Sequence, residues 1–301
     1  MMKEVIDTMS ENYEHLQIVK DLLKGAVIGL SAYVKPGGVH RLAPGKTYDE
    51  VLCNLISSVG FLAKALETGS SVRRGEQVLT SVDIGKLLSN VLKELFRSCR
   101  TVHPQYITPL VIGSFAIGLS GVESIVKESA KFKKALELAN SISKWSSIKQ
   151  FIETLKTVGR EDMYNHLSSL GYTEVGLLQL NVSYNDLYRV LGSKWRGFLV
   201  IETGEVLVFT YLKRLSELYK KYHELAMSTV ALYMELIKPH VPQSYVSILN
   251  NVESCGYMST PECSKLMIEL DVLLRRGKHT FEWASEITTL VAAFASFEGY
   301  T

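Results

Sequence analysis

The sequence predicts an all-α fold. Apolar residues recur every three to four positions along most of the 301 residues, which is the period of an amphipathic helix and not of a strand. Glycine, serine and proline gather between these stretches, where helices end. The apolar share of 47% is enough for a sizeable core, and no internal repeat, low-complexity tract or long linker divides the sequence. We therefore expect one multi-helix domain over residues 1–301.

The first helix is expected to end at Lys35. Its apolar stripe extends from Val5 to Leu30 at helical spacing. Pro36 limits it, because proline lacks an N–H and disfavours helical angles at the residue before it.

Further helices follow at similar spacing. Thr47 is a candidate N-cap with Glu50 as its capping-box partner, and the helix it starts should run to Gly69. Asp83 is the candidate cap of a helix that continues to Phe96. The apolar run 106–122 is too short to span a bilayer and contains a proline and glycines, so it predicts a buried core helix. Periodicity predicts the remaining helices over 123–142, 148–158, 161–170, 207–237, 262–276 and 281–298.

Residues 198–209 allow two interpretations. Two short apolar runs flank Glu202-Thr203-Gly204-Glu205, a pattern typical of a hairpin with a four-residue loop. A buried helix start would give a similar run, so the pattern leaves a short two-stranded ribbon and a helix both open.

Composition indicates a soluble, cytoplasmic protein. A net charge of +2 gives no general attraction to nucleic acid or to an anionic membrane. Charged residues among the first fourteen positions exclude a signal peptide, and no apolar run is long enough to cross a membrane. The four cysteines form no C-x-x-C pair, so we expect reduced thiols, with a Cys255–Cys263 disulfide as the less favoured alternative.

Residues 35–41, Lys-Pro-Gly-Gly-Val-His-Arg, concentrate groups that bind anions. A lysine supplies point charge, an arginine supplies paired donors, and glycines can leave backbone N–H groups open to a ligand. Such a turn suits a polyphosphate. The alternative is a helix-to-loop turn whose Lys35 and Arg41 are only solvated.

This segment resembles the opening signature of the triphosphoribosyl-dephospho-CoA synthase family, in which Pro-Lys-Pro-Gly leads into Val-Asp-Arg or Val-His-Arg. A second similarity runs from Asp162-Met163-Tyr164 to Val175-Gly176. A third joins Leu270-Asp271 and Leu274-Arg275 to Glu286-Ile287. The three similarities keep their order and spacing along most of the chain.

The resemblance implies an all-helical enzyme that joins ATP to 3'-dephospho-CoA. The acceptor's ribose hydroxyl attacks the anomeric carbon of ATP's ribose, adenine leaves, and the triphosphate stays on the transferred group. Such a site needs cations for the triphosphate, usually with Mg²⁺, a base for the hydroxyl, and stabilisation of an oxocarbenium-like centre. The expected partner is therefore a small-molecule nucleotide, and an oligomer is compatible with the sequence.

The resemblance also implies roles for individual residues. His40 and Glu286 are the candidate catalytic groups, and Asp162 and Glu286 are the candidate Mg²⁺ ligands. The candidate substrate- and phosphate-binding residues are Lys35, Gly37, Gly38, Arg41, His103 and Arg275. Several have structural alternatives, and the i, i+4 spacing of Asp271 and Arg275 predicts a local salt bridge first.

The chain departs from the family pattern at chemically important positions. Gly29 stands where the family has an acidic residue, and His103-Pro104-Gln105 replaces an Asn-Thr-Asn stretch. These losses motivate an alternative, a non-catalytic helical nucleotide-binding or scaffold protein on an inherited fold. A third reading is a different transferase that uses His40, His103 and Glu282.

Overall fold

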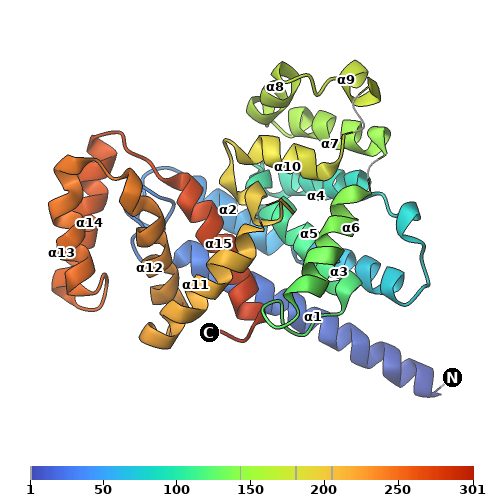
Figure 1. The fold of residues 1–301 in the computed structure, drawn as a ribbon, viewed down its shortest axis with the longest axis horizontal. Coiled ribbons are helices and arrows are strands. Elements are labelled where there is room, and N and C mark those ends of the chain that lie inside the picture. The colour runs from blue at the N-terminus through green and yellow to red at the C-terminus, as the bar shows by residue number, and fades with distance from the viewer. Residues whose placement is uncertain (1, 143, 180–181, 205) are drawn as a thin grey trace.

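The computed structural model describes the backbone of residues 2–142, 144–179, 182–204 and 206–301, with side chains from residue 13 onward. Every regular element in these ranges is a helix, which confirms the all-α prediction (Figure 1). The α-helices are α1 (Met2–Ser31), α2 (Thr47–Ser57), α3 (Val59–Arg73), α4 (Ile84–Cys99), α5 (Pro104–Ser120), α6 (Ser129–Ser141), α7 (Trp145–Thr157), α8 (Glu161–Ser169), α9 (Glu174–Gln179), α10 (Tyr184–Gly192), α11 (Leu207–Tyr222), α12 (Leu225–Ile237), α13 (Val246–Cys255), α14 (Pro261–Arg276) and α15 (Glu282–Phe297). Short 3₁₀ helices are η1 (Leu79–Ser81), η2 (Arg196–Val200), η3 (Lys238–His240) and η4 (Gln243–Tyr245).

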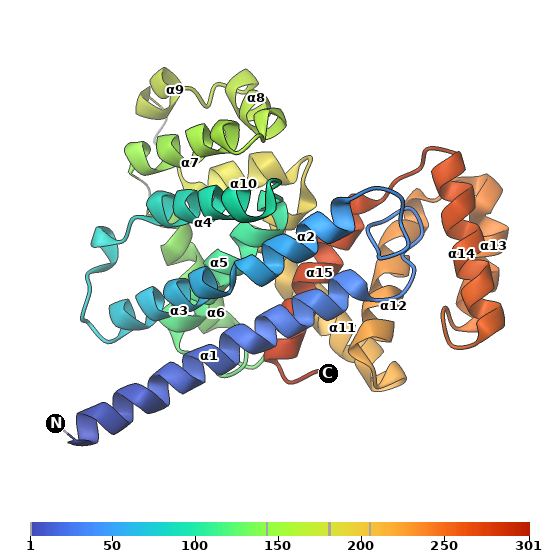
Figure 2. The ribbon, with the colours of Figure 1, turned by 180° about the vertical axis from the view of Figure 1, so that it is seen from behind.

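Helix α1 packs closely against α15, and its N-terminal part extends beyond the other helices (Figure 2). Two glycines make this close approach feasible. A Cβ on Gly25 would lie 2.2 Å from the carbonyl oxygen of Ala292, and one on Gly29 would lie 2.7 Å from the Ala292 Cβ. Gly29 therefore stands where a longer side chain would collide with α15. Val5, the first residue of the predicted apolar stripe, has a side chain outside the described part of the structure.

Helix α5 is the buried helix that the apolar run predicts. Nearly all its residues are buried, and Pro104 occupies its first turn, where a missing N–H costs no helical hydrogen bond. It crosses α3 at a second glycine contact. A Cβ on Gly69 would lie 2.2 Å from the Phe115 oxygen, and one on Gly118 would lie 2.1 Å from the Leu66 oxygen.

Two predicted helices are each broken into two. The helix expected over 47–69 is α2 and α3, which are bent by 47°. The helix expected over 207–237 is α11 and α12, separated where His223 adopts a left-handed φ of 54°. The Asp83 cap is confirmed, because its side chain accepts from the Lys86 N–H. The Thr47 capping box is wrong: α2 has no side-chain cap bond, and Glu50 contacts His103 instead.

Of the two alternatives left open for 198–209, the hairpin is wrong over the described residues. Arg196–Val200 forms the 3₁₀ helix η2, and α11 starts at Leu207. Phe198, Val200 and Ile201 are fully buried, so burial rather than strand pairing explains the apolar run. Glu205 of the expected loop lies outside the described residues.

The expectation of reduced cysteines is also wrong. Cys53 of α2 is joined to Cys99 at the end of α4, and Cys255 of α13 is joined to Cys263 of α14. The sequence could not reveal the first pair, because the two cysteines are 46 positions apart and meet only through tertiary packing. The second is the disulfide that the sequence offered as the minor alternative.

Buried apolar side chains from Val19 to Ala295 form one core cluster, as expected of a single multi-helix domain. Within the described residues, no helix taken singly has the length and apolar character of a membrane span. The bent pair α2–α3 meets those two criteria only when its helices are taken together.

Candidate functional site

The Lys35–Arg41 turn is organised by contacts within the protein. Lys35 is fully buried, and its Nζ donates to the carbonyl oxygens of Gly29 (2.6 Å) and Leu30 (3.0 Å). Burial lowers the pKa of Lys35 to about 7. The ammonium therefore satisfies carbonyls in the last turn of α1, which have no helical partner.

The backbone amides of the turn are occupied as well. Gly37 N–H donates to Asp271 Oδ1 at 2.8 Å, Gly38 N–H to the Lys35 oxygen at 2.8 Å, and Val39 N–H to Ser285 Oγ at 2.9 Å. A Cβ on Gly38 would lie 2.5 Å from both Ser285 Oγ and Tyr233 Oη. The expectation that Gly37 and Gly38 present open N–H groups to a phosphate is therefore wrong; close packing explains the glycines.

His40 and Arg275 complete this internal cluster. His40 is buried, with Nδ1 accepting from the Leu42 N–H and Nε2 lying 3.4 Å from Asp271 Oδ1. Arg275 Nε donates to Asp271 Oδ1 at 2.8 Å, and its Nη2 donates to the Gly38 carbonyl. Burial disfavours the Asp271 carboxylate, but hydrogen bonds from His40, Gly37 and Arg275 lower its pKa overall. The local salt bridge predicted for Asp271 and Arg275 is confirmed.

Arg41 points to a different part of the surface. It is exposed and lines a cavity of about 600 Å³ together with Tyr33, Glu224 and mostly apolar side chains. The structure therefore separates Arg41 from the buried groups of the same turn.

The other predicted residues converge on a polar cavity of about 280 Å³, which we call the Glu286 cavity. His103, Asp162 and Glu286 come from three distant segments of the chain and line it together. Its full lining is Val39, Thr47, Thr101, Val102, His103, Gln105, Tyr106, Arg160, Asp162, Trp195, Glu282 and Glu286. Lys35, Gly37, Gly38, His40, Arg41 and Arg275 are not part of that lining.

Glu286 lies on α15 at the wall of the cavity and is 5% exposed. Its Oε2 accepts the Gly197 N–H at 2.9 Å. Burial is the main cause that raises the pKa of Glu286 to about 7, and the neighbouring Glu282 charge adds to it, while the Gly197 and Gln105 hydrogen bonds and Arg160 oppose the shift. A carboxyl group that titrates near neutral pH can take up or release a proton during a reaction.

Arg160 is a cavity residue that sequence reasoning missed. It holds Asp162 through two hydrogen bonds, Nε to Oδ1 at 2.9 Å and Nη2 to Oδ2 at 2.8 Å. Its Nη1 also donates to the Val102 oxygen and to Gln105 Oε1, and the guanidinium lies over the Trp195 ring. Burial opposes ionisation of Asp162, but Arg160 lowers its pKa overall. The sequence signal that could have identified Arg160 was its position two residues before Asp162.

The Asp162 and Glu286 pair does not fit a resident Mg²⁺ site. Both Asp162 oxygens accept from Arg160, and Glu286 already accepts a backbone N–H. Over the described residues, no three His, Cys, Asp or Glu side chains are grouped so that they could hold a metal ion.

His103 and Tyr106 also belong to the cavity's polar lining. The ring nitrogen Nε2 of His103 lies 3.0 Å from Glu50 Oε2, and the backbone N–H of His103 donates to Asn54 Oδ1. Burial lowers the pKa of His103, although Glu50 opposes this. The Tyr106 side chain is 1% exposed, and its hydroxyl has no hydrogen-bond partner among the described residues. A buried hydroxyl without a partner at a cavity wall is suited to bind a polar ligand atom.

Comparisons with protein-family models, curated proteins and solved structures gave no match to this chain.

Proposed function

We propose that the chain is a transferase that works in the Glu286 cavity. The observation that carries the proposal is the meeting of Glu286, His103, Asp162 with Arg160, and the unpartnered Tyr106 hydroxyl at one cavity. Titratable groups with shifted pKa values in a shared cavity are typical of catalytic sites. The resemblance of the sequence to triphosphoribosyl-dephospho-CoA synthases suggests the reaction: transfer of a triphosphoribosyl group from ATP to 3'-dephospho-CoA with release of adenine.

In this proposal Glu286 accepts the proton of the attacking hydroxyl. The acceptor oxygen bonds to the anomeric carbon as the bond to adenine breaks. Adenine leaves with that electron pair and takes up a proton from water, and Glu286 returns its proton to the solvent. Positive charge develops on the ribosyl ring, so the carboxylates of Glu282 and Asp162 would stabilise the transition state. Tyr106 and His103 would orient the ring oxygens. A volume of about 280 Å³ suits the ribosyl portion of a nucleotide, with the phosphates nearer the opening.

The test is adenine release. The purified protein, mixed with ATP, MgCl₂ and 3'-dephospho-CoA, should release adenine that is quantified by chromatography. Glu286→Gln should lower the rate by about 100-fold or more, because it removes the proton acceptor while keeping the shape. Glu269→Gln is the matched control, since Glu269 is an exposed residue of α14. No adenine from the folded wild type would contradict the proposed reaction.

A second candidate is the scaffold form of the alternative, a non-catalytic helical protein without a nucleotide site, and the occupied turn favours it. Lys35 and the amides of Gly37 and Gly38 already have internal partners, so the turn has a structural role without a ligand. The two candidates differ in nucleotide binding. If ATP with MgCl₂ raises the melting temperature of the wild type, a scaffold without a nucleotide site is contradicted, because selective binding to the native state must stabilise it.

A further inference from the structure

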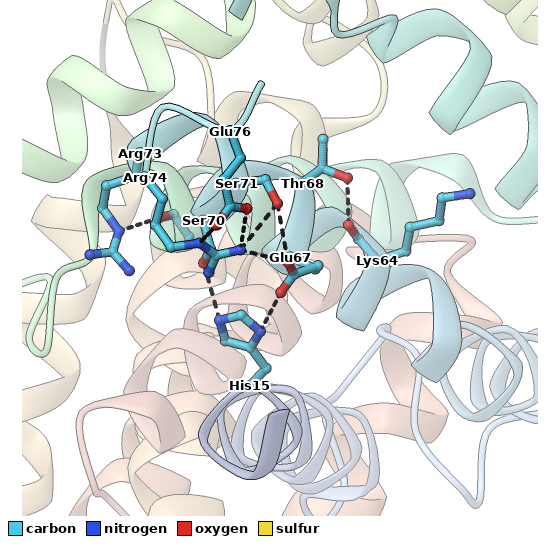
Figure 3. A network of polar contacts seen from close by, with 10 residues as sticks. His15, Lys64, Glu67, Thr68, Ser70, Ser71, Arg73, Arg74 and Glu76 are labelled. Atoms are coloured by element: carbon cyan, nitrogen blue, oxygen red, sulfur yellow. Dashed lines mark hydrogen bonds and ion pairs between the residues drawn. The ribbon is translucent and has the colours of Figure 1, made fainter. Parts of the chain in front are cut away.

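Helices α1 and α3 bring together a serine, a histidine and a glutamate outside the Lys35–Arg41 turn and the Glu286 cavity (Figure 3). Ser70 Oγ lies 3.1 Å from His15 Nε2, and His15 Nδ1 lies 2.9 Å from Glu67 Oε2. The acid and the hydroxyl thus contact opposite nitrogens of one imidazole ring. This is the order of contacts in a nucleophile–base–acid triad.

The partners fix the hydrogen positions. An ionised carboxylate only accepts, so the His15 nitrogen facing Glu67, Nδ1, must carry the hydrogen. In the neutral imidazole the other nitrogen, Nε2, then accepts the hydrogen of the Ser70 hydroxyl. Histidine is therefore oriented to remove a proton from Ser70, and the Glu67 carboxylate would stabilise the imidazolium that forms.

Glu67 is itself held in place by other groups. Its Oε1 accepts from Arg74 Nη2 at 2.8 Å and from Ser71 Oγ at 3.1 Å. The second oxygen, Oε2, therefore faces His15. Figure 3 shows Arg74 and Ser71 on the side of Glu67 away from the imidazole.

A cavity of about 240 Å³ adjoins the triad, and both Ser70 and His15 line it. Gly118 and Gly121 of its wall lie close to α3: a Cβ on Gly118 would lie 2.9 Å from the Ser70 nitrogen, and one on Gly121 would lie 2.9 Å from Arg73 Cδ. None of the residues that line this cavity lines the Glu286 cavity.

Arg73 supplies positive charge at the same cavity. Its Nε donates to the Gly118 carbonyl at 3.1 Å, which fixes the guanidinium beside the cavity wall. A guanidinium there can stabilise the oxyanion that forms when a hydroxyl attacks an ester carbonyl. A nucleophile, an oriented base, a cation and a space for substrate therefore meet at one place.

We propose that Ser70, His15 and Glu67 form a second active site that hydrolyses esters of short acyl groups. Ser70 Oγ attacks the acyl carbon and its proton passes to His15 Nε2. The ester C–O bond breaks, and the alcohol leaves with that proton. Water then attacks the acyl-Ser70 carbon and gives a proton to His15; this proton returns to Ser70 Oγ as the carboxylic acid is released.

The test is covalent labelling of the full chain with methanesulfonyl fluoride, a reagent small enough for this cavity. Peptide mass spectrometry should find the methanesulfonyl group on Ser70, with fluoride released. Thr68→Ala is the matched control on the same helix and should still be labelled at Ser70, because the Thr68 hydroxyl donates to the Lys64 carbonyl oxygen and not to a member of the triad. His15→Gln should slow labelling by about 100-fold or more, since the base is lost. A purely structural contact between the helices would give no selective labelling of Ser70.

Ester hydrolysis gives a second measurement. The wild type should hydrolyse 4-nitrophenyl acetate faster than Ser70→Ala, with the difference abolished by prior labelling. Circular dichroism establishes that each variant is folded. If the folded wild type is not labelled at Ser70 after exhaustive treatment, the proposal is overturned, whether or not Ser70→Ala folds.

Discussion

Lys35 shows how one side chain can end a helix from within the core. Its ammonium reaches back to the carbonyls of Gly29 and Leu30, so it takes the place of the hydrogen-bond donors that a continued helix would supply. Pro36 prevents that continuation. Helix termination therefore explains why a lysine precedes Pro36, and no bound anion is needed to explain it.

Glu286 should make stability depend on pH. Burial raises its pKa from 4.5 to about 7, so between these values the native state binds more protons than the unfolded state. The contribution of this group to stability is therefore full below about pH 4.5 and is lost as the pH rises through about 7. Glu286→Gln should match the wild type near pH 4.5 and exceed its free energy of unfolding at pH 8 by up to about 3 kcal/mol.

Urea unfolding of both proteins at several pH values measures this difference. Other titrating groups are common to the two proteins, so only the difference between them reports on Glu286. If the free energies of unfolding of Glu286→Gln and the wild type differed by the same amount from pH 5 to pH 8, a raised pKa for Glu286 would be contradicted.

At the scale of elements, α2 and the end of α4 hold the segment that carries His103. Asn54 is buried, and its side chain donates to the Thr101 oxygen and accepts the His103 N–H, both at 2.8 Å. The next residue toward the N-terminus, Cys53, is bonded to Cys99. This part of the Glu286 cavity is therefore fixed by a covalent link and by two hydrogen bonds from adjacent residues.

Removing the Cys53–Cys99 disulfide should cost more stability than removing Cys255–Cys263. The first pair is separated by 46 positions and the second by 8, and a longer loop restricts the unfolded chain more. Loop closure predicts a loss of about 4 kcal/mol for Cys53→Ser with Cys99→Ser, and about 2.5 kcal/mol for the second pair. Denaturant unfolding without reductant measures both losses. Equal losses, or the reverse order, would contradict this prediction.

Periodicity located most helices, because each buries a continuous apolar stripe. It missed the break between α2 and α3, since the stripe continues across the bend, and it could not distinguish the buried η2 from a strand. His103, Asp162 and Glu286 were selected by resemblance and do share a cavity. Arg160 and Tyr106 were missed. The ligand-binding interpretation of the Lys35 turn did not anticipate its internal partners, because Asp271 and Ser285, which occupy two of its amides, are distant in the sequence.

At the scale of the whole molecule, α1 and α15 connect the sites. Ser285 of α15 holds the turn after α1 through Val39, and the next residue, Glu286, lines the Glu286 cavity. His15 lies on α1 well before that turn. The relative position of these two helices therefore sets the geometry of the Glu286 cavity and ties it to the end of α1.

The close crossing of α1 and α15 should be intolerant of even one added carbon. Gly25→Ala would place a Cβ 2.2 Å from the Ala292 carbonyl oxygen, so the helices must move apart, at a cost of about 1–3 kcal/mol. Gly60→Ala, on α3, is the matched control, because no atom lies within 4 Å of its added Cβ. Alanine is the better helix former there, so this variant should gain about 0.5–1 kcal/mol. The midpoints of thermal and urea unfolding should fall for Gly25→Ala and rise for Gly60→Ala. A rise in both variants would mean that α1 and α15 are not packed this closely.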